Sequence, residues 1–370
     1  MADRVVLTIG TKKGVFVAEA AKPRRSFELR GPFGPGVPVY STLIDTRGTP
    51  RLYASSCNPF FGMKVLRSTN MGKSFEETKS GPAFPKEDGR ALINIWSLEA
   101  GDGKKELWCG VEPASLFRSR DGGDSWEMVP GISNHEHARK WQPGNGGLCM
   151  HTIIRDGNRV HLGISTGGHY LSEDGGETFK ASNKGVGAGF APDPYPEFGQ
   201  CVHKIVRHED APGRLYMQNH GGWADWTGPG GPRPDIGVLR SDDHGRSWRS
   251  IAKGLPSDFG FPIVVHPHNA DTLYVMPLEP TTRACPGGAP AVWRSENGGD
   301  SWRRLARGLP KKESYFTVLR DAMDIDQLKE PALYFGTTTG QLWIGREGGE
   351  KWDCLFEALP PIHNVKVEGV

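Results

Sequence analysis

The chain has 370 residues and carries 45 lysines and arginines against 43 aspartates and glutamates, together with 50 glycines and 29 prolines. This richness in glycine and proline, with few runs of strong helix formers, favours short strands joined by turns and argues against a helical protein. The charges are balanced and interspersed, which argues against a nucleic-acid partner.

At the N-terminus, MADRVVLTIG contains an apolar run that is too short for a signal peptide or a membrane span. The six cysteines form no CxxC pair and no dense framework of the kind used by small secreted domains. We therefore expect a cytoplasmic protein with reduced thiols and no membrane partner.

Pairs of strand signals follow one another along the chain, and a turn motif comes after each pair. The first strands of the pairs are expected to begin at Val39, Ile93, Cys149, Cys201, Pro262 and Tyr315, and the second at Leu52, Leu107, Val160, Leu215, Leu273 and Leu333. The strand around Leu7 has no such partner before it. The segment IHNVKVE from Ile362 supplies one from the other end of the chain.

The turn motif reads Ser-x-Asp/Asn-x-Gly-x-Ser/Thr-aromatic. Copies begin at Ser68, Ser119, Ser172, Ser241 and Ser295, and a degraded copy begins at Gly345. In such a turn the Asp or Asn side chain accepts hydrogen bonds from backbone N–H groups, and the glycine supplies a positive φ. Copies start 50 to 69 residues apart, a period that suits a four-stranded propeller blade.

The predicted fold is therefore all-β, a seven-bladed β-propeller of four-stranded blades closed by the C-terminal strand joining the N-terminal blade. Closure in this way removes an open sheet edge. A single domain is expected to span residues 1–370.

The repeated turn resembles the Asp box of the BNR-repeat superfamily, which includes sialidases, xyloglucanases, sortilin-type receptors and a photosystem assembly factor. The segments that begin at Trp141, Pro192, Tyr216 and Gly254 resemble a bacterial group labelled BNR-repeat glycosyl hydrolase, or exo-α-sialidase-like. This resemblance implies a propeller that binds a polar, carbohydrate-like ligand and hydrolyses a glycosidic bond. The chain lacks the Arg-Ile-Pro segment typical of sialidases, so sialidase activity itself is not expected.

Long irregular segments at 131–147, 182–199, 221–237 and 279–291 either link blades or join the second and third strands of a blade. Strand direction places all of them on the face opposite the motif turns. Since long loops on a rigid scaffold are the usual seat of function, the site is expected at the channel mouth on this face.

His151 and His203 occupy matching positions near the start of two neighbouring inner strands, where other blades have Ile95 or Asn364. His220 ends the strand that follows His203, so the three imidazoles are expected to converge. Five further ligand-binding candidates are Trp141, Gln142, Gln200, Asn219 and Trp223. Arg155, Arg207 and Arg320 also occupy matching inner-strand positions, which repeat ancestry explains.

Three functions stay open at this point. Glycosidic hydrolysis needs two carboxyl groups, and no pair can be chosen from the sequence, so the catalytic candidates are Glu112, Asp258, His151 and His203. The cluster of His151, His203 and His220 could instead hold a divalent metal in a metal-dependent hydrolase, although no tight spacing enforces that geometry, and no other cofactor is implied. A non-catalytic scaffold that holds a protein partner is the third interpretation.

Overall fold

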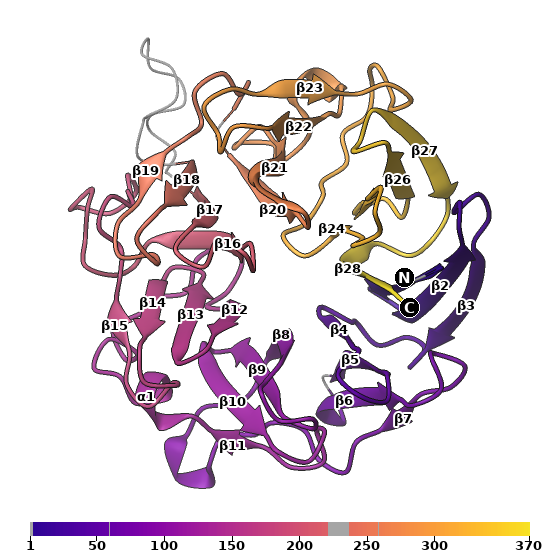
Figure 1. Ribbon diagram of the computed structural model, residues 1–370. Helices are drawn as coiled ribbons and strands as arrows, with labels where there is room; N and C mark the ends of the chain where they lie inside the picture. Colours follow the sequence, from indigo (N-terminus) through magenta and orange to yellow (C-terminus); the bar gives the residue numbers. More distant parts are fainter. Residues whose placement is uncertain (1–2, 59, 221–236, 258) are drawn as a thin grey trace.

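The computed structural model describes residues 3–58, 60–220, 237–257 and 259–370. Within these residues, seven four-stranded antiparallel sheets are arranged in a ring around a common centre (Figure 1). The predicted all-β, seven-bladed propeller is thus confirmed. The structure contains one short α-helix, α1 (Pro130–Ser133), and the 3₁₀ turns η1 (Lys86–Asp88) and η2 (Pro286–Gly288) in its described part. No helix there is long and apolar enough to cross a membrane.

The four strands of each blade are stacked outward from the centre of the ring, and the first strand named for each blade is the innermost. Blade 1 contains β28 (Ile362–Gly369), β1 (Arg4–Thr11), β2 (Gly14–Ala21) and β3 (Glu28–Phe33). Blade 2 contains β4 (Thr42–Asp45), β5 (Arg51–Asn58), β6 (Gly62–Ser68) and β7 (Glu76–Glu77), and blade 3 contains β8 (Asn94–Ala100), β9 (Leu107–Glu112), β10 (Ser115–Ser119) and β11 (Glu127–Met128). Blade 4 contains β12 (Met150–Asp156), β13 (Arg159–Ile164), β14 (Gly168–Ser172) and β15 (Lys180–Ala181).

The remaining three blades follow the same plan. Blade 5 contains β16 (Cys201–Arg207), β17 (Leu215–His220), β18 (Val238–Ser241) and β19 (Arg249–Ser250). Blade 6 contains β20 (Gly260–His266), β21 (Asn269–Pro277), β22 (Val292–Ser295) and β23 (Arg303–Leu305). Blade 7 contains β24 (Met323–Ile325), β25 (Leu333–Gly336), β26 (Leu342–Arg346) and β27 (Lys351–Phe356).

The ring closes as predicted, because β28 pairs antiparallel with β1 and places Val367 opposite Leu7. Both chain ends therefore lie in one blade (Figure 1). Ile362 and Val365 of β28 are fully buried. The apolar core lies between neighbouring blades, as where Leu7 packs in one cluster with Tyr334 of blade 7.

The repeated turns have the predicted hydrogen bonds. In the turn of blade 4, Asp174 accepts from the backbone N–H of Thr178 (2.9 Å) and from its hydroxyl (2.5 Å), and Ser172 Oγ accepts from the N–H of Gly176 (2.9 Å). Gly176 has a φ of 97°, a conformation that favours glycine. Because the side chain closes the turn, this motif is part of the scaffold.

We expect Asp174→Ala to lower the free energy of unfolding at neutral pH by about 1 kcal/mol, as other capping losses do. The Thr178 and Ser172 hydrogen bonds lower the pKa of Asp174 to about 2. A lowered folded-state pKa contributes stability above the unfolded value, and that stability is lost as the pH falls through the folded value. The deficit of the alanine variant should therefore shrink between about pH 4 and pH 2, which urea titrations at several pH values would measure.

Asp174→Asn is the matched control, since Asn297 makes the equivalent hydrogen bonds to Ser301 in blade 6. This variant should stay close to the parent at pH 7. Equal losses in the asparagine and alanine variants would contradict a capping role.

One predicted strand is wrong. Residues 315–320 form no strand, and the inner strand of blade 7 is instead β24, which begins at Met323. This segment is apolar because side chains such as Phe316 and Val318 are buried, but its backbone links blades 6 and 7 without forming a strand. Arg320 consequently lies outside any inner strand and does not match Arg155 and Arg207.

A β-bulge lies near the start of several inner strands. The pairing register shifts across Trp96 in β8, across His151 in β12, across His203 in β16 and across His363 in β28. These four residues therefore occupy equivalent positions, and the alignment of Ile95 and Asn364 with the histidines was wrong by one residue. A bulge redirects its side chain, which places these large residues along the channel.

Candidate functional site

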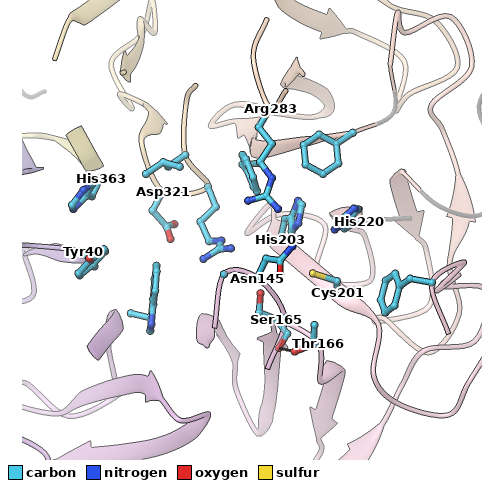
Figure 2. Close-up of a pocket in the computed structure, with 18 residues that line it drawn as sticks. Tyr40, Asn145, Ser165, Thr166, Cys201, His203, His220, Arg283, Asp321 and His363 are labelled. Atoms are coloured by element: carbon cyan, nitrogen blue, oxygen red, sulfur yellow. Dashed lines mark hydrogen bonds between the residues drawn. The ribbon is translucent and has the colours of Figure 1, made fainter. Parts of the chain in front are cut away.

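A cavity of about 400 Å³ opens at the channel mouth. It lies on the face formed by the links between blades and by the loops between second and third strands, which we call the link face. Its lining comes from all seven blades or their links, including Tyr40, Trp96, Thr166, His220, Arg283, Asp321 and His363 (Figure 2). The face on which the sequence predicts the site thus carries a cavity.

Three rings form an aromatic wall on one side of the cavity. Tyr40 stacks on His363 with a centroid separation of 4.6 Å and an interplanar angle of 8°, and Tyr40 contacts Trp96 at 4.8 Å. Burial lowers the pKa of His363 to about 4, so this imidazole is neutral at physiological pH. Uncharged rings that share one wall offer an apolar platform to a ligand.

Positive charge gathers at the same cavity. Arg283 comes from the loop between β21 and β22, and Arg320 comes from the link before β24, where its guanidinium lies 5.3 Å from the Trp96 ring centroid. Asp321 also lines the cavity, but its carboxylate forms an ion pair with Lys204 at 3.3 Å. Within the described residues no carboxylate pairs with Arg283 or Arg320, and Arg320 Nε is buried without a hydrogen-bond partner. The mouth therefore suits a ligand with acceptor or anionic groups.

Cys201, His203 and His220 lie on the wall opposite Tyr40 and His363 (Figure 2). The two imidazole centroids are 5.5 Å apart, and Cys201 and His220 are direct partners across β16 and β17. Burial keeps the pKa of His203 well below its usual value and lowers that of His220 to about 4, so both rings are neutral. Their potential metal-ligating atoms, with the Cys201 sulfur, all lie within 4.8 Å of one another.

His151 does not join this pair at the cavity. Its Nε2 contacts the carbonyl oxygen of Val202 at 2.8 Å and its Nδ1 contacts the Thr152 hydroxyl at 3.0 Å, so both ring nitrogens are engaged. The ring lines a second cavity, of about 480 Å³, on the side of the repeated turns. The structure thus brings His203 and His220 together, whereas His151 of blade 4 contacts the backbone of blade 5.

Several predicted ligand-binding residues support the surrounding loops instead of lining the cavity. Trp141 is buried and its indole N–H donates to the Tyr170 hydroxyl at 3.0 Å. Gln200 and Asn219 are also buried, and their side-chain amides donate to Pro196 (2.6 Å) and Gly187 (3.0 Å) in the link before blade 5.

Of the other predicted residues, two lie around the cavity and two lie outside the part of the chain that the structure describes. Gln142 is exposed, and its carbonyl accepts from the hydroxyl of Thr166, which lines the cavity. Glu112 accepts from the indole N–H of Trp96 at 2.8 Å and from Asn94 at 3.2 Å, so it lies behind the aromatic wall. Trp223 and Asp258 lie outside the described residues.

Sequence reasoning missed most of the cavity lining. Arg320 and Asp321 were missed because residues 315–320 were predicted to form a strand. Trp96 and His363 were missed because the bulge in their strands shifts the alignment of the blades by one residue. An alignment of the blades that allowed one inserted residue in each inner strand would have placed Trp96 and His363 beside His203.

Several known proteins are similar to this chain, although no family model matches it. A xyloglucanase from Paenibacillus sp is 26% identical over 301 residues, which cover 74% of this chain and 26% of that protein. The oligoxyloglucan-reducing end-specific xyloglucanase of Emericella nidulans is 26% identical over 227 residues, which cover 55% of this chain and 26% of that protein. The chain thus spans about a quarter of the length of these relatives.

Solved structures show the same architecture. The GH74 xyloglucanase from Xanthomonas campestris superposes with a TM-score of 0.63 at 16% identity, covering 97% of this chain and 53% of that chain. The structure described as YCF48 bound to D1 peptide superposes with a TM-score of 0.51 at 13% identity, covering 94% of this chain and 92% of that chain. At these identities the likeness establishes the fold alone.

Proposed function

We propose that this protein is a β-propeller glycosyl hydrolase of the BNR-repeat type that binds a polar, carbohydrate-like ligand at the link-face cavity. The observation that carries the proposal is the cavity itself, where a wall of stacked rings faces a set of hydrogen-bonding and cationic groups. An apolar wall with a few convergent polar groups is the usual form of a small-molecule site. The similarity to xyloglucanases adds support for a glycan ligand.

Hydrolysis of a glycosidic bond requires two carboxyl groups about 5 to 9.5 Å apart. Asp321 lines the cavity, and Glu112 is bonded to the indole of Trp96 in the cavity wall. We therefore propose Asp321 as one of the two carboxyl groups, and we retain Glu112, which lies behind the cavity wall, as the candidate that the sequence offers for the other. Glu112→Gln and Asp321→Asn should each stop the release of reducing ends while leaving oligosaccharide binding measurable.

We expect Trp96→Ala to weaken oligosaccharide binding roughly two- to tenfold, because an aromatic contact of this kind contributes about 0.5 to 1.5 kcal/mol. Calorimetric titration with xyloglucan oligosaccharides and a panel of other glycans would measure the change. Trp126→Ala is the matched control: this tryptophan closes a repeated turn on the opposite face, and its replacement should leave binding unchanged. Failure of the parent chain to bind any glycan in the panel would contradict the proposal.

A second candidate function is a scaffold for a protein or peptide partner. Phe60 and Phe61, in the loop between β5 and β6 on the link face, are 89% and 82% exposed. Large exposed rings of this kind mark interaction sites when they are grouped. The resemblance to YCF48 bound to D1 peptide favours the same interpretation. A Phe60→Ser, Phe61→Ser variant that still binds glycans but loses a protein partner would support both functions on one face.

We also propose a cytoplasmic location. All six cysteines are free, as expected for a reducing compartment. Fractionation of the native host would test this.

A further inference from the structure

Cys201, His203 and His220 form a compact group of nitrogen and sulfur donors. Their candidate ligand atoms lie within 4.8 Å of one another, and all three residues line the link-face cavity. Cys201 and His220 are cross-strand partners, and the bulge at His203 turns its ring toward the same place. Two neighbouring strands of one sheet therefore hold the group, which makes its geometry rigid.

The tautomer of His203 suits metal binding. Its Nδ1 lies 2.6 Å from the carbonyl oxygen of Gly260, an acceptor, so Nδ1 must carry the proton. Nε2 is then the unprotonated nitrogen. A histidine that ligates a metal almost always donates its other ring N–H to an acceptor of this kind, which fixes the ring and raises its basicity.

Phenylalanine rings cover one side of the group. The His203 ring contacts Phe261 at 4.6 Å between centroids, and the His220 ring contacts Phe259 edge-on at 5.0 Å. Phe190 adds a further contact to His220 at 6.1 Å. A hydrophobic shell of this kind limits water access to a metal and strengthens its bonds to the protein.

We propose that Cys201, His203 and His220 bind a zinc ion whose fourth coordination position opens into the link-face cavity. Cysteine sulfur and histidine nitrogen are donors that zinc prefers, whereas calcium and magnesium prefer oxygen. Binding converts the Cys201 thiol to a thiolate, and its proton leaves to solvent. Three protein ligands with one open position are the arrangement of catalytic zinc sites, while structural sites have four protein ligands.

The charges around the group indicate what the open position would take. A zinc ion with one thiolate keeps a net positive charge, and Arg283 and Arg320 line the same cavity. An anionic group is therefore the favoured fourth ligand, such as hydroxide or a carboxylate of a bound molecule. This proposal does not depend on a glycan being the ligand of the cavity.

The test uses the full chain, reduced with a phosphine, stripped with a chelator, loaded with zinc and then desalted. The parent protein should retain one zinc per chain by elemental mass spectrometry, and Cys201→Ser and His220→Ala should retain almost none. His220 is partly exposed at the end of β17, so its replacement is compatible with folding, which a thermal melt would verify. Loading with cobalt should also give a thiolate-to-metal absorption band that Cys201→Ser abolishes.

Cys149→Ser is the matched control. Cys149 precedes β12 at the place in blade 4 that Cys201 occupies in blade 5, but its sulfur contacts the Gly146 carbonyl at 3.1 Å and does not line the cavity. This variant should bind zinc like the parent. A parent chain that retains no zinc, or zinc that persists undiminished in both Cys201→Ser and His220→Ala, would overturn the proposal.

Discussion

Removal of residues 361–370 should destabilise the protein so strongly that little folded chain remains at room temperature. This deletion removes β28, whose Ile362, Val365 and Val367 side chains are almost completely buried. Each such side chain contributes about 1.5 to 3 kcal/mol, so the loss is roughly 5 to 9 kcal/mol, and a whole domain has a stability of only about 5 to 15 kcal/mol. The deletion also exposes the β1 edge, which invites aggregation.

Thermal melts by circular dichroism, together with gel filtration, would measure the effect. Deletion of Val370 alone is the control, because it leaves β28 intact and should shift the melting temperature only slightly. A synthetic peptide of residues 361–370 should restore part of the stability when it is added to the truncated chain. A truncated protein that melts like the parent would show that closure contributes nothing.

The sequence was sufficient for the ring because its signals repeat. Each serine and aspartate or asparagine of the turn motif makes its hydrogen bonds within eight residues, so the motif is readable without knowledge of the tertiary structure. The strand at Leu7 lacks an inner partner, and the strand at Ile362 belongs to no other blade. Pairing these two strands is the arrangement that satisfies the backbone hydrogen-bonding groups of both.

The site was only partly predictable, because it depends on single-residue shifts and on long-range contacts. A bulge at His203 turns its ring to His220, whereas the same bulge at His151 leads to a ring held by Val202. Both rings contact a backbone carbonyl of the next blade, that of Gly260 for His203, and His203 has in addition His220 on the next strand of its own blade. Likewise, Gln200 and Asn219 were predicted to bind the ligand, but their amides donate to backbone carbonyls of the preceding link, a role that residue type alone does not reveal.

Replacement of Lys366 by methionine should cost about 1 to 3 kcal/mol of stability at neutral pH, between the values for exposed and buried ion pairs, because the charge cluster it belongs to is half-buried. Lys366 lines the cavity on the side of the repeated turns, together with Glu99, Asp321 and Asp324. Burial alone would lower the pKa of Lys366, but these carboxylates outweigh burial and raise it. Methionine would fill much of the volume and leave the carboxylates without this cation.

The pH dependence identifies the cause of this loss. Burial raises the pKa of Glu99 and that of Asp324, and Lys366 opposes both shifts. Without Lys366 both carboxyl groups should bind protons still more tightly in the folded state. A raised folded-state pKa means that stability falls as the pH rises above the unfolded value of about 4, so the deficit of the variant should be larger at pH 8 than at pH 5.

Urea titrations of both proteins at the two pH values would measure this difference. Lys351→Met is the matched control, because the Lys351 side chain is 58% exposed and its nearest carboxylate, on Asp353, is 3.8 Å away. Such a surface pair contributes about 0 to 1 kcal/mol, so this control should resemble the parent at both pH values. A Lys366→Met deficit that is the same at pH 5 and pH 8 would mean that lost packing, and not the uncompensated carboxylates, explains the change.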